Sequence, residues 1–216
     1  MLFSDNFEAE VITDPDGWEM NYASFANFFV GGGGTVDLLG TPNGFGLVGD
    51  GQFVDLDGSS GQAGFLETIQ QFDVAAGQLV TLSFSGGGSQ RGQGIDNLFG
   101  GFRFFGTPVV SGVTLRGFAT AETSNAPSPT LFGVDPFVFA TDPYQTYSIS
   151  FRTNAATRFS AVIGTGGGDN IGPLVDNVTI SAQAIPEPAT WGLMILGFGT
   201  AGAMLRRRRS GALAAA

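Results

Sequence analysis

The chain offers a narrow choice of residues for chemistry. Its 216 residues include no His and no Cys, and all nine of its cations are Arg. Without His or Cys there can be no Ser-His-Asp triad, no Cys nucleophile and no ordinary zinc site. Any metal site must therefore be built from oxygen ligands, which favours Ca²⁺. The acidic groups available for chemistry are 19 Asp and Glu side chains.

Carboxylates could act in metal binding or in hydrolysis. The segment Asp55-x-Asp57-Gly58-Ser59 has the start of a Ca²⁺-loop pattern, but it lacks a third spaced carboxylate and a closing Glu. A strand that ends in a glycine turn is the better interpretation. The 18 carboxylates of residues 1–185 could supply a glycosidase pair, but no spacing singles one out. We therefore expect no enzymatic activity, with a carboxylate-based glycoside hydrolase as an alternative.

Aromatic residues outside the apolar runs are candidates for sugar binding. Trp18, Tyr22 and Tyr144 lie in polar or turn-like segments, and an aromatic face can stack on a pyranose ring. Arg91 lies in a glycine-rich segment, where it could pair with a sugar hydroxyl, a ligand carboxylate or a local Asp. These four residues form the predicted ligand-binding set, whereas most of the 21 Phe residues are expected in the core.

The charge of the chain is unevenly distributed. Residues 1–185 contain five Arg and 18 carboxylates, a net charge of −13, and the other four Arg are consecutive at 206–209. Such a surface repels phosphate backbones, so no nucleic-acid partner is expected. Neutral glycans or Ca²⁺ fit this surface better.

Three features follow one another near the C-terminus. Pro186-Glu187-Pro188 disfavours helix and sheet pairing and should remain extended. Residues 189–205 carry no charge over 17 positions, near the lower limit for a helix that spans a bilayer. The basic run that follows is a cytoplasmic stop by the positive-inside rule, and it consists of Arg206, Arg207, Arg208 and Arg209.

Trp191 and the Gly-Phe-Gly at 197–199 complete this pattern. Taken in order from Pro186, Glu187 and Pro188 to the four Arg, it resembles the PEP-CTERM sorting signal of Gram-negative bacteria. The resemblance implies an exported protein that is processed by exosortase, a membrane enzyme, while it passes through the inner membrane. It also implies an outer-surface or extracellular-matrix location and an association with exopolysaccharide and biofilm. An ordinary C-terminal anchor is the alternative interpretation.

The N-terminus lacks the signal peptide that export requires. Residues 1–6, Met-Leu-Phe-Ser-Asp-Asn, have neither a basic segment nor a long apolar run. Insertion by the tail alone would carry four Arg across the membrane, which the charge rule disfavours. We therefore expect the natural start to lie upstream of Met1.

The rest of the chain has the pattern of short β-strands. Apolar and polar residues alternate with period two within 78–85, 146–152, 157–164 and 174–181, and glycine clusters separate such runs. Further strands are expected at 3–11, 35–39, 52–56, 65–72, 98–105, 109–119 and 131–140. These strands predict an all-β fold, an antiparallel β-sandwich or jelly roll, followed by a C-terminal transmembrane helix. The expected domains are a sandwich at 1–181, a Pro-Glu-Pro linker at 182–188, the transmembrane helix at 189–205 and a basic cytoplasmic tail at 206–216.

Two segments at the ends of this body form a further pattern. The opening is Asp5-Asn6-Phe7-Glu8, and the closing segment is Gly172-Pro173-Leu174-Val175-Asp176-Asn177-Val178-Thr179-Ile180. Together they resemble galactose-binding-like jelly-roll modules. The resemblance implies that the first and last strands lie together and hold a structural Ca²⁺ through Glu8, Glu10 and Asp176.

Of these carboxylates, Asp176 carries a signal of its own. It shares the parity of Val178 and Ile180, so it should point inward and need a partner. The alternative is that the three carboxylates are solvated charges at a strand edge.

The favoured function is a non-catalytic surface module that is associated with exopolysaccharide and binds carbohydrate weakly. The second hypothesis is a purely structural or adhesive surface protein that binds no small ligand. The third is the carboxylate-based hydrolase.

Overall fold

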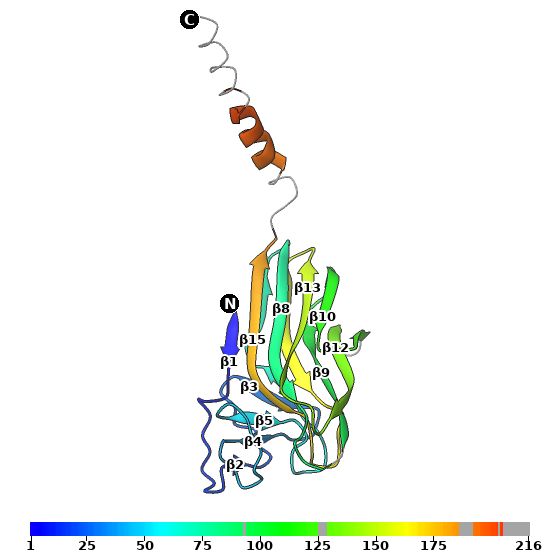
Figure 1. Ribbon diagram of the computed structural model, residues 1–216. Coiled ribbons are helices and arrows are strands. Elements are labelled where there is room, and N and C mark those ends of the chain that lie inside the picture. Colours follow the sequence, from blue (N-terminus) through cyan, green and yellow to red (C-terminus); the bar gives the residue numbers. More distant parts are fainter. Residues whose placement is uncertain (93, 125–128, 186–191, 203, 205–216) are drawn as a thin grey trace, which may run out of the picture. The chain divides into compact units, whose positions relative to one another are not determined.

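The structure is a computed structural model that describes residues 1–92, 94–124, 129–185, 192–202 and 204 (Figure 1). The chain divides after Gln183 into two units, which are described separately. The first unit consists of two antiparallel β-sheets, as the alternating sequence pattern predicts.

The strands of the first sheet include the first and the last strand of the chain. In spatial order they are β10 (Val110–Arg116), β13 (Gln145–Thr153), β8 (Gln78–Gly87), β15 (Leu174–Ala184), β5 (Phe53–Asp55), β4 (Asp37–Leu39) and β2 (Trp18–Glu19). The short β1 (Phe3–Asp5) also pairs with β15. Figure 1 shows β15, β8, β13 and β10 side by side.

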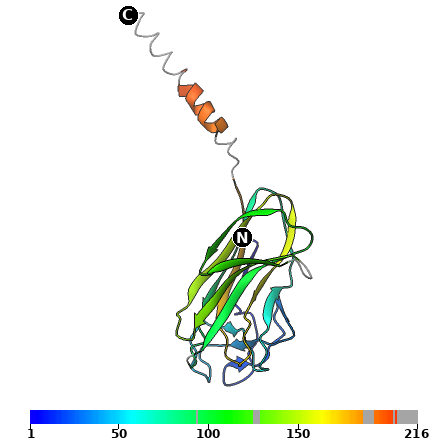
Figure 2. The same ribbon diagram turned by 90° about the vertical axis from the view of Figure 1, so that its right-hand side faces the viewer.

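The second sheet packs against the first. Its order is β11 (Thr120–Ser124), β12 (Thr130–Phe139), β9 (Ile95–Phe104), β14 (Thr157–Gly164), β6 (Phe65–Thr68) and β3 (Phe28–Gly31). The short β7 (Phe72–Val74) pairs with β14 beyond β6. The long strands of both sheets run along the body (Figure 2).

The two sheets enclose a large apolar core. Every second residue of β8 and β13 points into it, and the register pairs Val80 with Phe151, Leu82 with Ile149 and Phe84 with Tyr147. Across the sandwich, the ring of Phe102 on β9 lies 4.8 Å from that of Phe151, edge to face. Buried rings in this geometry stabilise the fold both by removing apolar area from water and by their pairing. Phenylalanines therefore make much of the core, as expected.

One end of the body is built from the shortest strands. β2, β4 and β5 lie together there, in the lower part of Figure 1. A second, smaller apolar cluster supports them and is formed by Leu39, Leu47, Phe53 and Leu174. The start of β15 pairs with β5 through Leu174 and Asp55. This pairing brings the acidic segment after β5 next to the loop that precedes β15.

Several strands differ from the sequence expectation. β2, β3 and β11 lie outside the expected ranges, and β3 is a continuous apolar run without the alternation that the analysis sought. The expected strand at 65–72 is two strands, β6 and β7, which both pair with β14. β15 continues through Ala184, so residues 182–184 belong to the strand rather than to the linker expected at 182–188.

The first strand is shorter than expected. It ends at Asp5, because Phe7 has a φ of 59°, which an extended strand cannot contain. The Phe7 N–H instead donates to Asp5 Oδ1 at 2.8 Å. β1 pairs with β15, with Phe3 opposite Ile180, so the first and last strands lie together as expected. The galactose-binding-like assignment itself stays a prediction.

The second unit contains a short helix over residues 192–202 and 204. Among the described residues, no helix is long and apolar enough to cross a membrane. The transmembrane helix expected at 189–205 also covers 189–191, 203 and 205, which lie outside the described residues. So do the basic tail at 206–216 and the motif residues Pro186, Glu187, Pro188, Trp191, Arg206, Arg207, Arg208 and Arg209.

Candidate functional site

The outer face of the second sheet carries a groove of about 470 Å³, a size typical of ligand-binding pockets. Three half-buried rings line it: Phe65 on β6, Phe99 on β9 and Phe132 on β12. Successive side chains of a strand point to opposite faces, so Phe99 faces outward while its neighbour Leu98 is buried in the core. Phe99 and Phe132 pack edge to face with ring centres 5.5 Å apart. The groove therefore has an accessible aromatic lining.

Gly164 lies between two of these rings. It is the last residue of β14 and pairs with Phe65 on one side and with Phe99 on the other. A Cβ at this position would lie 2.5 Å from the Phe99 ring and 2.6 Å from the Phe65 Cβ. The close approach of both side chains thus requires a residue without a Cβ.

An ion pair lies beside the rings. Nη2 of Arg103 is 3.0 Å from Oε2 of Glu67, which is almost fully buried. The Ser160 hydroxyl donates to the other oxygen of Glu67. The guanidinium carbon of Arg103 lies 5.8 Å from the Phe65 ring centre, and this side chain keeps 29% of its surface exposed. Glu67 thus holds a partly accessible cation against the aromatic lining.

Two more polar side chains line the groove. Glu122 stands on the edge strand β11 and is exposed. Asn97 on β9 accepts a hydrogen bond from the Gly166 N–H at 2.7 Å through Oδ1. The groove therefore combines aromatic rings with a cation, an anion and an amide, which is a set of groups suited to binding a polar ligand with apolar faces.

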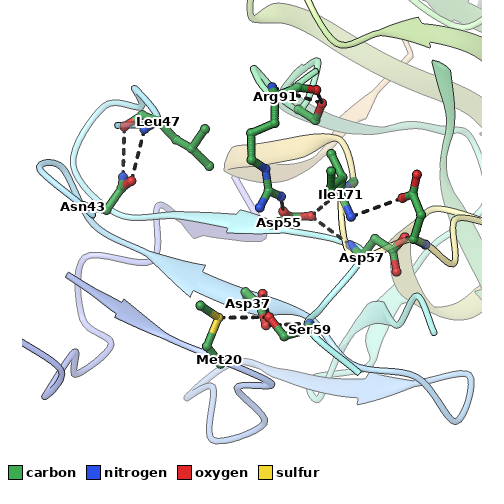
Figure 3. Close-up of polar contacts among 12 residues, drawn as sticks. Met20, Asp37, Asn43, Leu47, Asp55, Asp57, Ser59, Arg91 and Ile171 are labelled. Carbon is green, nitrogen blue, oxygen red and sulfur yellow. Dashed lines mark hydrogen bonds and ion pairs between the residues drawn. The ribbon is translucent and has the colours of Figure 1, made fainter. Parts of the chain in front are cut away.

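An acidic cluster, formed by Asp55, Asp57, Asp96 and Asp169, lies near the end of the sandwich where β5 meets β15 (Figure 3). Asp55 is 1% exposed and forms an ion pair with Arg91. Its Oδ1 accepts hydrogen bonds from the N–H groups of Asp57 and Gly172, both at 3.0 Å. The charge of Asp55 is therefore well compensated.

The other members of the cluster are less well compensated. Asp57 is fully buried, and its Oδ2 accepts a hydrogen bond from the Asp169 N–H at 3.0 Å. Within the described ranges, neither Oδ1 of Asp57 nor Oδ2 of Asp96 has a hydrogen-bond donor, and both atoms are buried. Buried polar atoms normally have a partner, so these two oxygens need an explanation.

Burial and mutual repulsion raise the pKa values in this cluster. Burial raises the pKa of Asp55 to about 7, although the charge of Arg91 opposes the shift. Burial, followed by the charges of Asp169 and Asp57, raises the pKa of Asp96 to about 6. Burial and the charge of Asp169 also raise the pKa of Asp57.

The four predicted ligand-binding residues do not gather at the groove. Trp18 packs on Phe45, with ring centres 4.4 Å apart, and Trp18 and Tyr144 both pack on the small apolar cluster. The Tyr22 hydroxyl donates to Glu10 at 3.1 Å, and Arg91 pairs with Asp55. Each of the four thus contacts other parts of the protein, and their role in ligand binding stays a prediction.

The structure separates the three predicted Ca²⁺ ligands into two environments. Asp176 is 2% exposed, as its parity predicts, and burial together with the charges of Asp50 and Glu8 raises its pKa to about 7. Glu10 instead accepts hydrogen bonds from the Ala26 N–H and the Tyr22 hydroxyl. Across the part of the chain that the structure describes, no group of three or more acidic side chains is arranged to hold a metal ion.

Sequence reasoning missed the groove, although part of it carried a signal. Phe99 and Phe132 have the outward parity of strands whose inward residues include Leu98 and Leu131. A large apolar residue at an outward position is a candidate contact for a ligand. Glu122 had no such signal, because β11 was not expected as a strand.

The fold and the groove define a β-sandwich protein with an exposed aromatic site on one sheet. Residues 184–209 of the chain match the PEP-CTERM protein-sorting motif. The protein is thus an exported surface protein whose C-terminal signal is processed by exosortase, a membrane enzyme. A search of curated protein sequences found no match.

Proposed function

We propose that this exported protein is a non-catalytic module that binds neutral polysaccharide through the groove of the second sheet. It acts on the outer surface or in the extracellular matrix of a Gram-negative bacterium after its tail has been processed. The observation that carries the proposal is the accessible lining formed by Phe65, Phe99 and Phe132 beside the Arg103 guanidinium.

The groups in the groove suit the chemistry of a sugar chain. The apolar faces of pyranose rings stack on aromatic side chains, while their hydroxyls need donors and acceptors. Arg103 supplies donors, Glu122 supplies acceptors, and Asn97 lies between them in type. The acidic surface of residues 1–185, with a net charge of −13, favours a neutral polymer over an anionic one.

The position of Glu67 favours binding over catalysis. A general acid or nucleophile must reach the substrate, but Glu67 is 3% exposed and is engaged by Arg103 and Ser160. The other carboxylate of the groove, Glu122, is exposed on an edge strand. This arrangement supports Glu67 as the residue that positions Arg103.

Affinity electrophoresis in gels containing neutral bacterial exopolysaccharides tests the proposal. Phe99→Ala and Phe132→Ala should each weaken binding about tenfold, a loss of ~1.4 kcal/mol, as for a typical aromatic contact residue. Phe137→Ala is the matched control, because Phe137 is 64% exposed and lies outside the groove lining.

The outcomes separate the competing hypotheses. Retardation that is lost in Phe99→Ala and Phe132→Ala but kept in Phe137→Ala supports the groove. Equal loss in all three variants would place binding elsewhere. No retardation by any neutral or acidic polysaccharide would instead favour a purely structural or adhesive surface protein.

A further inference from the structure

The loop of residues 165–172, which joins β14 to β15, folds over the acidic cluster. A Cβ at Gly167 would lie 2.5 Å from Asp57 Oδ2, and one at Gly172 would lie 2.7 Å from Asp55 Oδ1. The main chain of the loop therefore approaches both carboxylates closely, and it donates N–H groups to each. A loop held on buried carboxylates depends on how their charge is compensated.

Compensation is incomplete at Asp57. This side chain is fully buried, yet its Oδ1 has no donor within the described residues, and neither has the buried Oδ2 of Asp96. The nearby guanidinium, that of Arg91, is engaged by Asp55. A bare carboxylate oxygen inside a protein costs several kcal/mol unless a proton, a water or a cation reaches it.

We propose that Asp57, Asp96 and Asp169 form a Ca²⁺ site that fastens the loop of residues 165–172 to the end of β5. The donor atoms are carboxylate oxygens, which Ca²⁺ prefers, and main-chain carbonyls and water would complete the coordination shell. Electrostatic repulsion between Asp57 and Asp169, and between each of them and Asp96, is seen in their raised pKa values. A divalent cation would convert that repulsion into attraction.

Binding requires one side chain to move. The three carboxylates do not surround a common metal position as they stand in the described structure. Asp169 is exposed and follows three consecutive glycines, so its side chain can turn toward Asp57 at little cost. Its main-chain N–H already donates to Asp57 Oδ2, which keeps the two residues adjacent.

Titration of the full chain with CaCl₂ after removal of metal by EDTA tests this site. Calorimetry and thermal unfolding should be followed from about 0.1 to 10 mM, because extracellular Ca²⁺ sites bind at roughly 10⁻⁴–10⁻³ M. We expect binding heat and a rise in Tm of about 3–6 °C at ten times the Kd.

Four variants locate the site. Asp57→Asn and Asp169→Asn should bind Ca²⁺ about tenfold more weakly or not at all, since affinity depends on ligand charge. Asp169 is exposed, so Asp169→Asn keeps the test valid if the buried variant does not fold. Asp16→Asn removes an exposed carboxylate far along the chain and should bind as the wild type does.

Asp176→Asn tests the rival position between the first and last strands, and it too should retain binding. The proposal is overturned if Ca²⁺ gives no heat and no change in Tm. It is also overturned if Asp169→Asn and Asp57→Asn bind normally, or if Asp176→Asn alone loses the response.

Discussion

Asp57 Oδ2 accepts a hydrogen bond from the main-chain N–H of Asp169 at 3.0 Å, across 112 residues of sequence. This bond holds the glycine-rich loop of residues 165–172 against the end of β5. The start of the same loop lines the groove, where Gly166 donates its N–H to Asn97. The acidic cluster and the aromatic groove are therefore connected by one short loop.

Gly164→Ala should disturb the groove from below. The new methyl group would lie 2.5 Å from the Phe99 ring, so Phe65 and Phe99 must move apart. We expect a loss of about 1–3 kcal/mol in the free energy of unfolding, as for other overpacked sites, measured by urea denaturation. Gly94→Ala is the control, because a Cβ there meets nothing within 4 Å. Equal stability of the two variants would contradict the close packing described here.

Arg91→Ala should leave a buried charge without its partner. Asp55 is 1% exposed, and Arg91 is its ion-pair partner. We expect a loss of about 3 kcal/mol in the free energy of unfolding at pH 8, the lower end of the range for broken buried pairs, because Arg91 is 22% exposed. The double variant Arg91→Ala/Asp55→Asn should recover part of this loss. If the single variant loses less than about 1 kcal/mol, the pair acts as an ordinary surface ion pair.

Stability should fall as the pH rises through neutrality. The pKa values of Asp55 and Asp176 are raised from 3.8 to about 7 in the folded chain, so the folded state binds protons more tightly than the unfolded state does. This contribution is fully present below about pH 4 and is lost as the pH rises toward 7 and above.

Urea denaturation in EDTA between pH 5 and pH 8 measures this effect. EDTA is needed because a bound cation would mask the repulsion. Asp176→Asn, which cannot ionise, should reduce the difference in stability between the two pH values. A wild-type protein that is more stable at pH 8 than at pH 5 would refute the assignment.

Trp18→Ala should affect stability more than binding. The indole is half-buried against Phe45 and the small apolar cluster. We expect a loss of about 2 kcal/mol in the free energy of unfolding, below the range for fully buried rings. Retardation in polysaccharide gels should be unchanged. Loss of binding without loss of stability would restore Trp18 as a ligand contact.

Replacement of Pro186, Glu187 and Pro188 by Ala should prevent processing of the tail. The PEP-CTERM match covers 184–209, and these three residues open the motif itself. Mass spectrometry of the extracellular and membrane fractions from a host with exosortase measures the outcome. We expect a shortened product for the wild type and a full-length, cell-associated chain for the variant. Identical products from both would show that the motif does not direct processing.

Much of the fold was predictable from local pattern. Gln78–Gly87 and Gln145–Thr153 alternate with period two, and the buried residues of both strands are those that the alternation selects. The inward position of Asp176 followed from the same parity. Short runs without alternation, such as Phe28–Gly31, were missed because a continuous apolar run carries no information on which face is buried.

The candidate sites were less predictable. Phe65, Phe99 and Phe132 resemble core phenylalanines in sequence, and only the pairing of their strands places them together on an outer face. Asp57 and Asp169 are likewise far apart in sequence and meet because β5 pairs with the start of β15.

The sequence by itself determined the export signal, the β-rich body and the absence of His and Cys chemistry, because motifs, alternation and composition are local properties. The tertiary structure alone decided which aromatics are accessible and which carboxylates lack compensation. Those properties depend on strand order and on the close approach of distant segments, which no local pattern contains.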